Sequence, residues 1–244
     1  MTTNKASQEW WEQTWKGVPL APPPPQQPVR RWLEQYVPRT VDGTCFEVGC
    51  HPGRFLAVMG MLGYELNGVD MTPEVENISG WLERDGYRVG SIAQGDFFEY
   101  DPGRQYDVVM SLGFIEHFTD WERVLERHIP LVAPGGRLVI EVPNMAGSVQ
   151  NWFHRTFDRE SYDRHHIPAM NPGAWIEILR GHDFDIEFEG PFGHLYLWVE
   201  PQQRSLPERT GVFALRAAQK LARPFLPHGR YAYAPALGLV ARRK

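Results

Sequence analysis

The chain has 244 residues, which is long enough to bury one sizeable core and typical of an undivided α/β domain. Lys and Arg number 25 against 30 Asp and Glu, and the formal charge of −5 excludes a broad basic face for nucleic acid. No stretch approaches the roughly 20 apolar residues that cross a bilayer, and the two cysteines, Cys45 and Cys50, are too few and too badly placed for a disulfide scaffold. We therefore expect a cytoplasmic protein without a nucleic-acid or membrane partner.

A Trp-rich segment opens the chain. The spacing predicts a short helix over residues 7–16, with Trp11 and Trp15 four residues apart on one face. The prolines at 22–25 predict an extended connector, so residues 1–40 are expected to form an N-terminal helical flap on a Pro-rich linker. The tryptophans either close over a substrate, with Trp11 as a substrate-binding residue, or anchor the helix on the body. Anchoring is favoured because an exposed tryptophan is costly.

Apolar runs then alternate with segments of helical spacing, and this alternation is typical of a doubly wound α/β fold with a parallel sheet between helices. Strands are predicted near residues 44–48, 65–70, 88–93, 105–111, 136–142 and 184–188, and helices near 29–37, 53–62, 74–85, 120–131, 172–180 and 212–221. An apolar segment at 236–241 follows.

Residues 144–171 interrupt the alternation. They are rich in aromatic, Arg and His residues, show no clean period, and are too long for an ordinary connection, so a functional insertion at the carboxyl edge of the sheet is expected. Arg155, Arg159 and Arg164 interleave with aromatic residues such as Tyr162. This pattern is typical of a partly apolar pocket for a carboxylate, a phosphate or a glycosyl nucleotide, with Tyr162 and Arg164 as substrate-binding residues, and it is equally typical of a solvated face.

A glycine-punctuated turn carries the strongest functional signal. The first strand ends in Glu47, the turn holds Gly49 and Gly53, and the second strand ends in Asp70. Backbone amides of such a turn attract a carboxylate or phosphate, and an acidic residue at the end of the next strand accepts hydrogen bonds from ribose hydroxyls. The arrangement predicts an adenosine-containing ligand.

A third strand is followed by Gly95-Asp96-Phe97, where Asp96 is placed to read an adenine amino group and Phe97 to stack on the base. Each feature alone is common in protein cores and helix caps, but their order and spacing together form a strong signal. The turn lacks the full GxGxxG of dinucleotide enzymes, so a nicotinamide-dependent oxidoreductase is the weaker alternative.

In these segments the chain resembles the class I S-adenosylmethionine-dependent methyltransferases. The segments that carry the resemblance are Glu47-Val48-Gly49-Cys50-His51-Pro52-Gly53, Asp70, Gly95-Asp96-Phe97, Tyr106-Asp107-Val108-Val109-Met110-Ser111, Phe114-Ile115-Glu116-His117-Phe118 and Pro134-Gly135-Gly136-Arg137-Leu138-Val139-Ile140-Glu141-Val142-Pro143. The resemblance implies a methyltransferase domain over residues 41–244, with a Rossmann-like, seven-stranded, mostly parallel sheet and an antiparallel last strand.

The resemblance also implies the cofactor S-adenosylmethionine, the product S-adenosylhomocysteine, and a set of contact residues. The implied cofactor-binding residues are Glu47, Gly49, Cys50, His51, Gly53, Asp70, Met71, Asp96, Phe97 and Ser111. One of them departs from the family pattern, because His51 stands where the usual motif has its middle glycine. His51 is expected either to point to solvent or to contact the cofactor carboxylate.

Methyl transfer from a sulfonium is an in-line displacement, and a hydroxyl acceptor also needs a base. The candidate bases are His117, which either faces the methyl group or braces its loop, and the adjacent pair His165 and His166. Adjacent side chains of an extended segment point to opposite sides, so at most one of the pair is expected in the pocket, and His166 is slightly favoured. The stretch around the pair resembles that of methyltransferases acting on sugars, quinone precursors and other small metabolites.

The sequence therefore predicts transfer of a methyl group to a hydroxyl of a small molecule, such as a sugar or secondary-metabolite scaffold. An N-methyltransferase of a small amine and a non-catalytic cofactor-binding protein remain the alternatives. No metal is expected, because Asp163, His154 and the His165 pair match no zinc spacing. The expected assembly is a monomer or homodimer.

Overall fold

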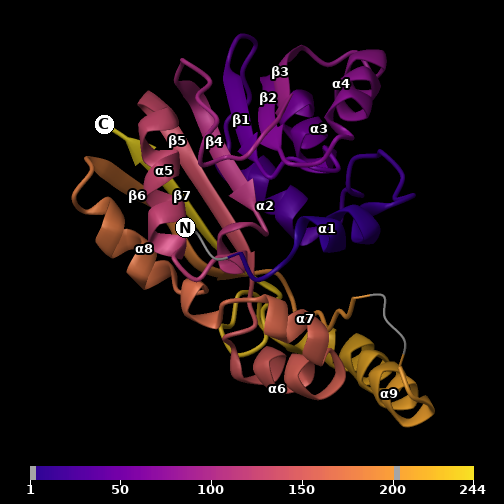
Figure 1. The fold of residues 1–244 in the computed structure, drawn as a ribbon. Coiled ribbons are helices and arrows are strands. Elements are labelled where there is room, and N and C mark those ends of the chain that lie inside the picture. Colours follow the sequence, from indigo (N-terminus) through magenta and orange to yellow (C-terminus); the bar gives the residue numbers. More distant parts are fainter. Residues whose placement is uncertain (1–3, 201–203) are drawn as a thin grey trace.

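A seven-stranded sheet with strand order β3-β2-β1-β4-β5-β7-β6 forms the centre of the molecule (Figure 1). The computed structural model describes residues 4–200 and 204–244. β7 pairs antiparallel with both β5 and β6, whereas β1 pairs parallel with β2 and β4. The strands are β1 (Thr44–Val48), β2 (Glu65–Asp70), β3 (Val89–Gln94), β4 (Tyr106–Leu112), β5 (Val132–Pro143), β6 (Phe184–Phe192) and β7 (Ala236–Arg243). The predicted fold class, including the antiparallel last strand, is confirmed.

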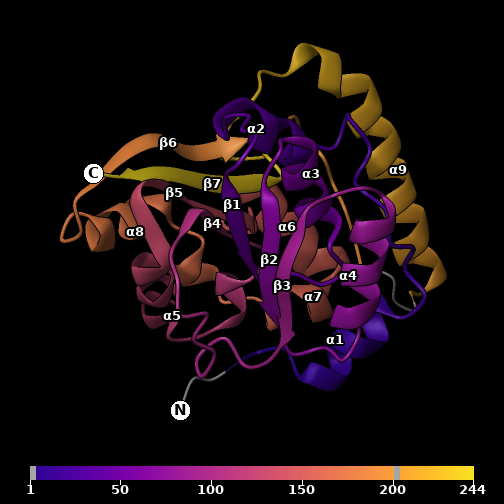
Figure 2. The ribbon, with the colours of Figure 1, turned by 90° about the horizontal axis from the view of Figure 1, so that it is seen from above.

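Helices cover both faces of this sheet (Figure 2). One face is covered by α2 (Pro28–Tyr36), α3 (Arg54–Met61) and α4 (Val75–Arg84), whose buried side chains form a single core with β1, β2 and β4. The opposite face is covered by α5 (Trp121–His128) and α8 (Pro172–Leu179), which bury a second core. Two faces each packed on helices explain why the central strands are continuous apolar runs instead of alternating ones.

Sequence signals set the ends of several helices. Pro28 occupies the first turn of α2, where its missing amide costs nothing, and the Gln27 side chain accepts a 2.6 Å hydrogen bond from the Arg30 amide. The helix expected near 120–131 instead ends at His128 and continues as a 3₁₀ turn, Ile129–Leu131, because Pro130 cannot supply an α-helical hydrogen bond.

The segment 144–171, whose sequence shows no clean period, nevertheless forms helices. It contains α6 (Ser148–Phe157) and α7 (Arg159–Arg164), which in Figure 1 lie with α9 (Leu206–Ala222) beyond the lower end of the sheet. α9 also begins earlier than the predicted residue 212, because a capping box between Ser205 and Glu208 starts it. α6 and α9 share a small apolar cluster of their own that includes Phe153 and Val212.

The N-terminal helix α1 (Gln8–Trp15) begins after Ser7, whose hydroxyl accepts a 3.2 Å hydrogen bond from the Trp10 amide. Residues 16–27 join it to α2 without helix or strand. α1 lies at the end of the sheet where the parallel strands finish (Figure 1). Among the described residues, no helix is long and apolar enough to cross a membrane.

Candidate active site

A cavity of about 710 Å³ lies where β1, β2 and β4 end, and α1 forms part of its wall. Its volume is within the range of small-molecule sites, roughly 300–1,000 Å³. Ten residues singled out in the sequence line it: Trp11, Glu47, Gly49, Cys50, His51, Asp70, Met71, Asp96, Phe97 and His117. Six others do not: Gly53, Ser111, Tyr162, Arg164, His165 and His166. The fold therefore brings together most of the predicted cofactor residues but only one of the three candidate bases.

The glycine turn between β1 and α3 requires its glycines. Gly49 has a φ of 69°, and a Cβ built on it would lie 2.6 Å from the Phe114 ring. Gly53 has a φ of 81° and begins α3, and a Cβ there would lie 2.5 Å from Ile78. Gly49 therefore lets the main chain form the cavity wall, while Gly53 shapes the turn from behind.

Asp70 fixes the turn through the backbone. Its Oδ2 accepts a 3.0 Å hydrogen bond from the His51 amide, and its Oδ1 accepts a 2.9 Å hydrogen bond from the Thr72 amide. A carboxylate has about four lone-pair sites, so both oxygens keep capacity for a ligand. The His51 ring is half-buried in the cavity wall, 6.0 Å from the Trp15 ring, and burial lowers the pKa of His51.

Glu47 is buried at the end of β1 with no hydrogen-bond partner for its Oε2 in the described part of the chain. Burial raises the pKa of this carboxyl well above its ordinary value, and the charge of Arg54 opposes the rise. The Arg54 guanidinium itself lies 4.9 Å from the Phe55 ring and 5.3 Å from the Trp15 ring. A buried carboxyl oxygen without a hydrogen-bond partner beside the cavity is a candidate partner for a cationic group of a ligand.

The residues that follow β2 and β3 line the cavity to different extents. Phe97 is only 5% exposed and packs on the His128 ring at 4.8 Å, so it braces the wall more than it covers it. Met71 is 44% exposed, whereas the Ser111 side chain is fully buried inside the sheet. Asp96 Oδ1 accepts a 2.9 Å hydrogen bond from the Phe98 amide, which turns the chain after β3.

His117 is nearly buried at the inner end of the cavity. Its Nδ1 lies 3.1 Å from the Arg164 carbonyl oxygen, and its ring meets the Trp11 ring edge-on at 4.8 Å. A carbonyl only accepts, so Nδ1 carries the proton and Nε2 presents a lone pair. Burial lowers the pKa of His117 well below its ordinary value, and neighbouring His165 lowers it further.

Neither of the two other candidate bases lines the cavity. The His165 ring is 4.6 Å from the His117 ring, and its Nδ1 is 2.6 Å from the Ser161 carbonyl oxygen. His166 is placed instead by its backbone amide, which donates a 2.6 Å hydrogen bond to the Glu116 carbonyl. Of the two, His165 is the one that lies beside His117. Neither lines the cavity, so the preference for His166 stays a prediction.

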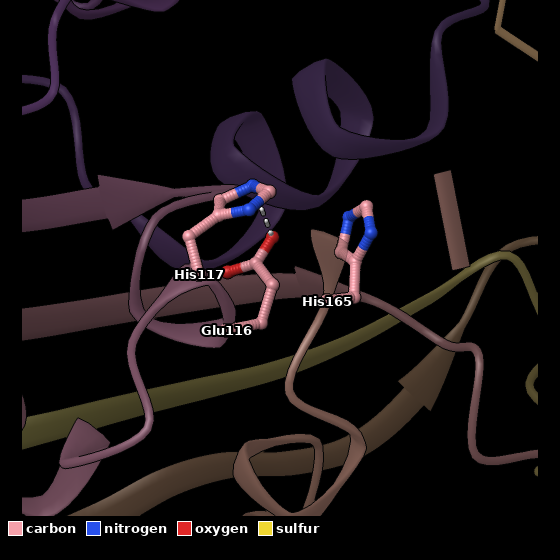
Figure 3. Close-up of side chains that lie close together, drawn as sticks. All are labelled: Glu116, His117 and His165. Atoms are coloured by element: carbon pink, nitrogen blue, oxygen red, sulfur yellow. Dashed lines mark ion pairs between the residues drawn. The ribbon is translucent and has the colours of Figure 1, made fainter. Parts of the chain in front are cut away.

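Glu116 belongs to one of the segments that resemble the methyltransferases, but the sequence predicts no role for its side chain. Figure 3 shows its carboxylate beside the His117 ring, with His165 approaching from a distant segment. Glu116 Oε1 is 3.8 Å from His117 Nε2, which is too long for a hydrogen bond. In the sequence, only the adjacency of Glu116 and His117 indicates that Glu116 lies near a candidate base. His165 is 48 positions after His117, so its proximity to them cannot be predicted from local spacing.

The proposed substrate residues of the insertion lie elsewhere. The Tyr162 hydroxyl accepts a 2.9 Å hydrogen bond from Asn151, and the Arg164 guanidinium lies 4.1 Å from the Trp10 ring and pairs with Glu200. A second, open hollow of about 850 Å³ lies beside α6. Its lining is Ala146, Ser148, Asn151, Trp152, Arg155, Thr156, Arg159, Tyr231 and Ala232.

The segment before α1 holds the helix against the site. The Lys5 amide donates a 2.7 Å hydrogen bond to the His117 carbonyl, and the Lys5 ammonium donates a 2.9 Å hydrogen bond to the His165 carbonyl. Gln8 Nε2 donates a 3.3 Å hydrogen bond to the Met71 carbonyl. α1 thus contacts both ends of the cavity without filling it.

Comparison with known proteins identifies the family. A family profile described as a methyltransferase domain matches residues 25–188, which is more than half of the chain. The chain belongs to this methyltransferase family. The resemblance to class I S-adenosylmethionine-dependent methyltransferases is confirmed at the level of family and fold.

Individual relatives of this methyltransferase are distant. The ubiquinone biosynthesis O-methyltransferase of Coxiella burnetii is 25% identical over 141 residues, covering 57% of this chain and 58% of the relative. The chain thus matches less than two thirds of that protein's length. A SAM dependent methyltransferase from Archaeoglobus fulgidus has a TM-score of 0.55 at 21% identity, covering 88% of this chain and 93% of that one.

A second solved structure shares the fold. The N-methyltransferase NodS from Bradyrhizobium japonicum WM9, in complex with S-adenosyl-L-homocysteine, has a TM-score of 0.52 at 14% identity. The match covers 98% of this chain and 94% of NodS. At this identity the likeness establishes the fold alone.

Proposed function

We propose that this methyltransferase uses S-adenosylmethionine to methylate a hydroxyl of a small molecule. The observation that carries the proposal is the cavity at the carboxyl edge, in which the Gly49 turn and Asp70 form one wall and His117 another. Related proteins named as ubiquinone biosynthesis O-methyltransferases, and a structural neighbour in complex with S-adenosylhomocysteine, support the cofactor and the oxygen acceptor.

In this proposal the adenosine lies along the wall formed by β2 and β3. The Asp70 carboxylate accepts hydrogen bonds from the ribose hydroxyls, and Asp96 meets the adenine, with Phe97 and Met71 beside it. The amino-acid end of the cofactor lies at the turn, near Glu47, Cys50 and His51. Gly53 and Ser111 support this wall without touching the cofactor.

Methyl transfer then needs an acceptor placed between the sulfonium and His117. The acceptor oxygen attacks the methyl carbon in line, the carbon–sulfur bond breaks, and its electron pair remains on sulfur as S-adenosylhomocysteine. The hydroxyl proton passes to His117 Nε2, the lone pair left free by the hydrogen bond between Nδ1 and the Arg164 carbonyl. Trp11, which contacts the His117 ring, borders the acceptor space.

Calorimetric titration with S-adenosylhomocysteine tests the cofactor. We expect micromolar binding by the wild type and a loss of affinity of about 10- to 100-fold in Asp70→Asn, because hydrogen bonds to a charged group contribute about 1.5–3 kcal/mol. Asn keeps one acceptor oxygen for the turn, and the melting temperature reports whether the turn survives. Asp163→Asn, on the exposed side of α7, is the matched control and should bind like the wild type. No binding by a folded wild type contradicts the proposal.

The acceptor class is tested with His117→Ala. With hydroxylated acceptors, the variant should lose about 100-fold or more in turnover while keeping its affinity for S-adenosylhomocysteine, because general-base catalysis contributes about 10²–10⁴-fold. An amine loses its proton before attack and needs no strong base. Undiminished turnover of an amine acceptor by the variant would therefore favour N-methylation.

We also propose a cytoplasmic location and a monomer or homodimer. Both thiols, Cys45 and Cys50, are buried and unpaired, which suits a reducing compartment. Light scattering of the purified protein tests the assembly.

A further inference from the structure

We propose that Glu116, His117 and His165 form a binding site for one divalent transition-metal cation, with Zn²⁺ as its probe. These residues come from two segments that are distant in the sequence, the turn after β4 and the end of α7. Their metal-ligating atoms all lie within 4.8 Å of one another. Figure 3 shows the Glu116 carboxylate and the two imidazole rings converging on one space.

The separations suit a small cation after a modest contraction. Zinc bonds of 2.0–2.1 Å in a tetrahedral site place neighbouring ligand atoms about 3.4 Å apart. Since these atoms lie at most 4.8 Å apart, the side chains would have to approach one another by up to about 1.4 Å. Two imidazoles and one carboxylate are a ligand set that binds Zn²⁺ or Fe²⁺ while leaving coordination positions open.

The Glu116 carboxylate supplies an independent reason for a ligand. The side chain is fully buried, and neither of its oxygens has a hydrogen-bond partner among the described residues. A buried carboxyl without hydrogen-bond partners destabilises the folded state, and more so if it is ionised. A cation at this position would give the carboxylate its missing partner.

The two imidazoles are already oriented as metal ligands. His117 Nδ1 lies 3.1 Å from the Arg164 carbonyl, and His165 Nδ1 lies 2.6 Å from the Ser161 carbonyl. Each Nδ1 therefore carries the proton, and each Nε2 presents its lone pair. A metal-ligating histidine commonly donates its second ring N–H to a backbone carbonyl in this way.

His117 belongs both to the proposed metal site and to the wall of the cavity. This ring lines the cavity, whereas Glu116 and His165 lie behind it, so a bound cation would sit between the cavity and the interior. An open coordination position can take the acceptor hydroxyl, lower its pKa and let its proton leave to water before the oxygen attacks the methyl carbon. This role rests on the proposed function for its hydroxyl acceptor and its cofactor. It replaces one step, the transfer of the proton to His117, because the Nε2 lone pair cannot bind the cation and a proton at once.

Titration of the metal-free protein with ZnCl₂ tests the site directly. The His194 and His228 rings lie 3.3 Å apart and offer a competing pair of ligands, so the measurement uses a His228→Asn background. We expect one equivalent of Zn²⁺ to bind, and Glu116→Gln and His165→Gln each to weaken binding by at least about tenfold. His128→Gln is the matched control, because His128 is also buried with Nδ1 on a carbonyl four residues back, at 2.7 Å, and should bind Zn²⁺ like the background.

Failure of this inference differs from failure of the proposed function. The metal site is overturned if the background protein does not bind Zn²⁺. It is also overturned if the Glu116→Gln and His165→Gln variants bind Zn²⁺ as tightly as the background protein. S-adenosylhomocysteine titrated into the same samples reports the cofactor cavity separately, and circular dichroism reports folding. If one variant does not fold, the other decides the result.

Discussion

Several carboxyl oxygens around the cavity are buried without hydrogen-bond partners in the described part of the chain, which destabilises the folded protein. Glu47 Oε2 and both carboxyl oxygens of Glu116 are buried without hydrogen-bond partners among the described residues. Glu47 is the last residue but one of β1, and Glu116 lies in the short turn that follows β4. Buried unsatisfied groups are rare in folded proteins and concentrate at functional sites. Their positions therefore mark where ligands complete the structure.

Gly49 is the residue at which conformation and space both forbid a side chain. Gly49→Ala should destabilise the protein more than Gly86→Ala, measured as the free energy of unfolding in urea. Gly86 has a φ of 85° with nothing near its Cβ position, so its substitution carries only the left-handed strain of about 1–2 kcal/mol. Gly49→Ala adds the collision with the Phe114 ring, about 1–3 kcal/mol more. Equal losses in the two variants would show that the Phe114 contact is unimportant.

Glu47 should make cofactor binding depend on pH. Burial raises its pKa well above the usual value, so the carboxyl of the free protein keeps its proton to higher pH than an ordinary glutamate does. A cofactor ammonium placed beside it favours the ionised form. Binding of S-adenosylhomocysteine then releases a proton, and affinity rises with pH between the pKa of Glu47 in the complex and its higher pKa in the free protein.

Calorimetry in buffers of different ionisation enthalpy measures this proton release. Glu47→Gln is the control, since it keeps the shape of the side chain and has no proton to lose. Proton release of the same size in Glu47→Gln would assign the proton to another group.

At the scale of elements, α1 closes the cavity while contributing little to the core. None of its side chains is fully buried, and its contacts run to His117, His51 and Met71. Removal of residues 1–16 should therefore lower affinity for S-adenosylhomocysteine by about tenfold or more, which corresponds to a loss of about 1.4 kcal/mol in binding free energy. The melting temperature should change little.

A single substitution separates closure from general stability. Trp15→Leu, which removes contacts with His51 and Arg54, should weaken binding in the same direction as the truncation. Trp152→Leu on α6 changes an exposed tryptophan outside the cavity and should leave affinity unaltered. If the truncated protein binds as tightly as the full chain, α1 is only an anchored appendage.

The central sheet could be predicted from the sequence because its strands are apolar runs bounded by glycine and acidic residues. The cofactor wall could be predicted for the same reason, since Asp70 and Asp96 follow those strands. α6 and α7 could not, because α6 buries Gln150, Phe153 and His154 on one side, so polar residues occupy positions where an amphipathic pattern needs apolar ones. The Glu116 and His165 pairing depends on tertiary packing, which no local spacing encodes.

At the scale of the whole molecule, the last strand completes the sheet from the inside. β7 pairs with β5 over residues 236–242 and with β6 over 236–243, so two neighbours depend on it for hydrogen bonds. Gly238 in this strand lies under Trp32 of α2, and a Cβ built on it would be 2.6 Å from the indole. β7 therefore also packs directly against α2.

Truncation before Ala236 should therefore prevent folding, because β5 and β6 would each expose an unpaired edge and part of the core. The expected result is an aggregated or unfolded product by size-exclusion chromatography and circular dichroism. Removal of Lys244 alone, whose ammonium forms an exposed ion pair with Asp185, is the matched control and should leave the melting temperature nearly unchanged. A folded, cooperative product from the longer truncation would contradict the role given to β7.

The most direct test of the account is a crystal structure of the protein with S-adenosylhomocysteine. We expect the ligand to occupy the cavity beneath α1, with the ribose hydroxyls within about 3.2 Å of the Asp70 carboxylate and the amino-acid end at the Gly49 turn. A ligand bound in the hollow beside α6, or an adenosine turned away from Asp70, would contradict it.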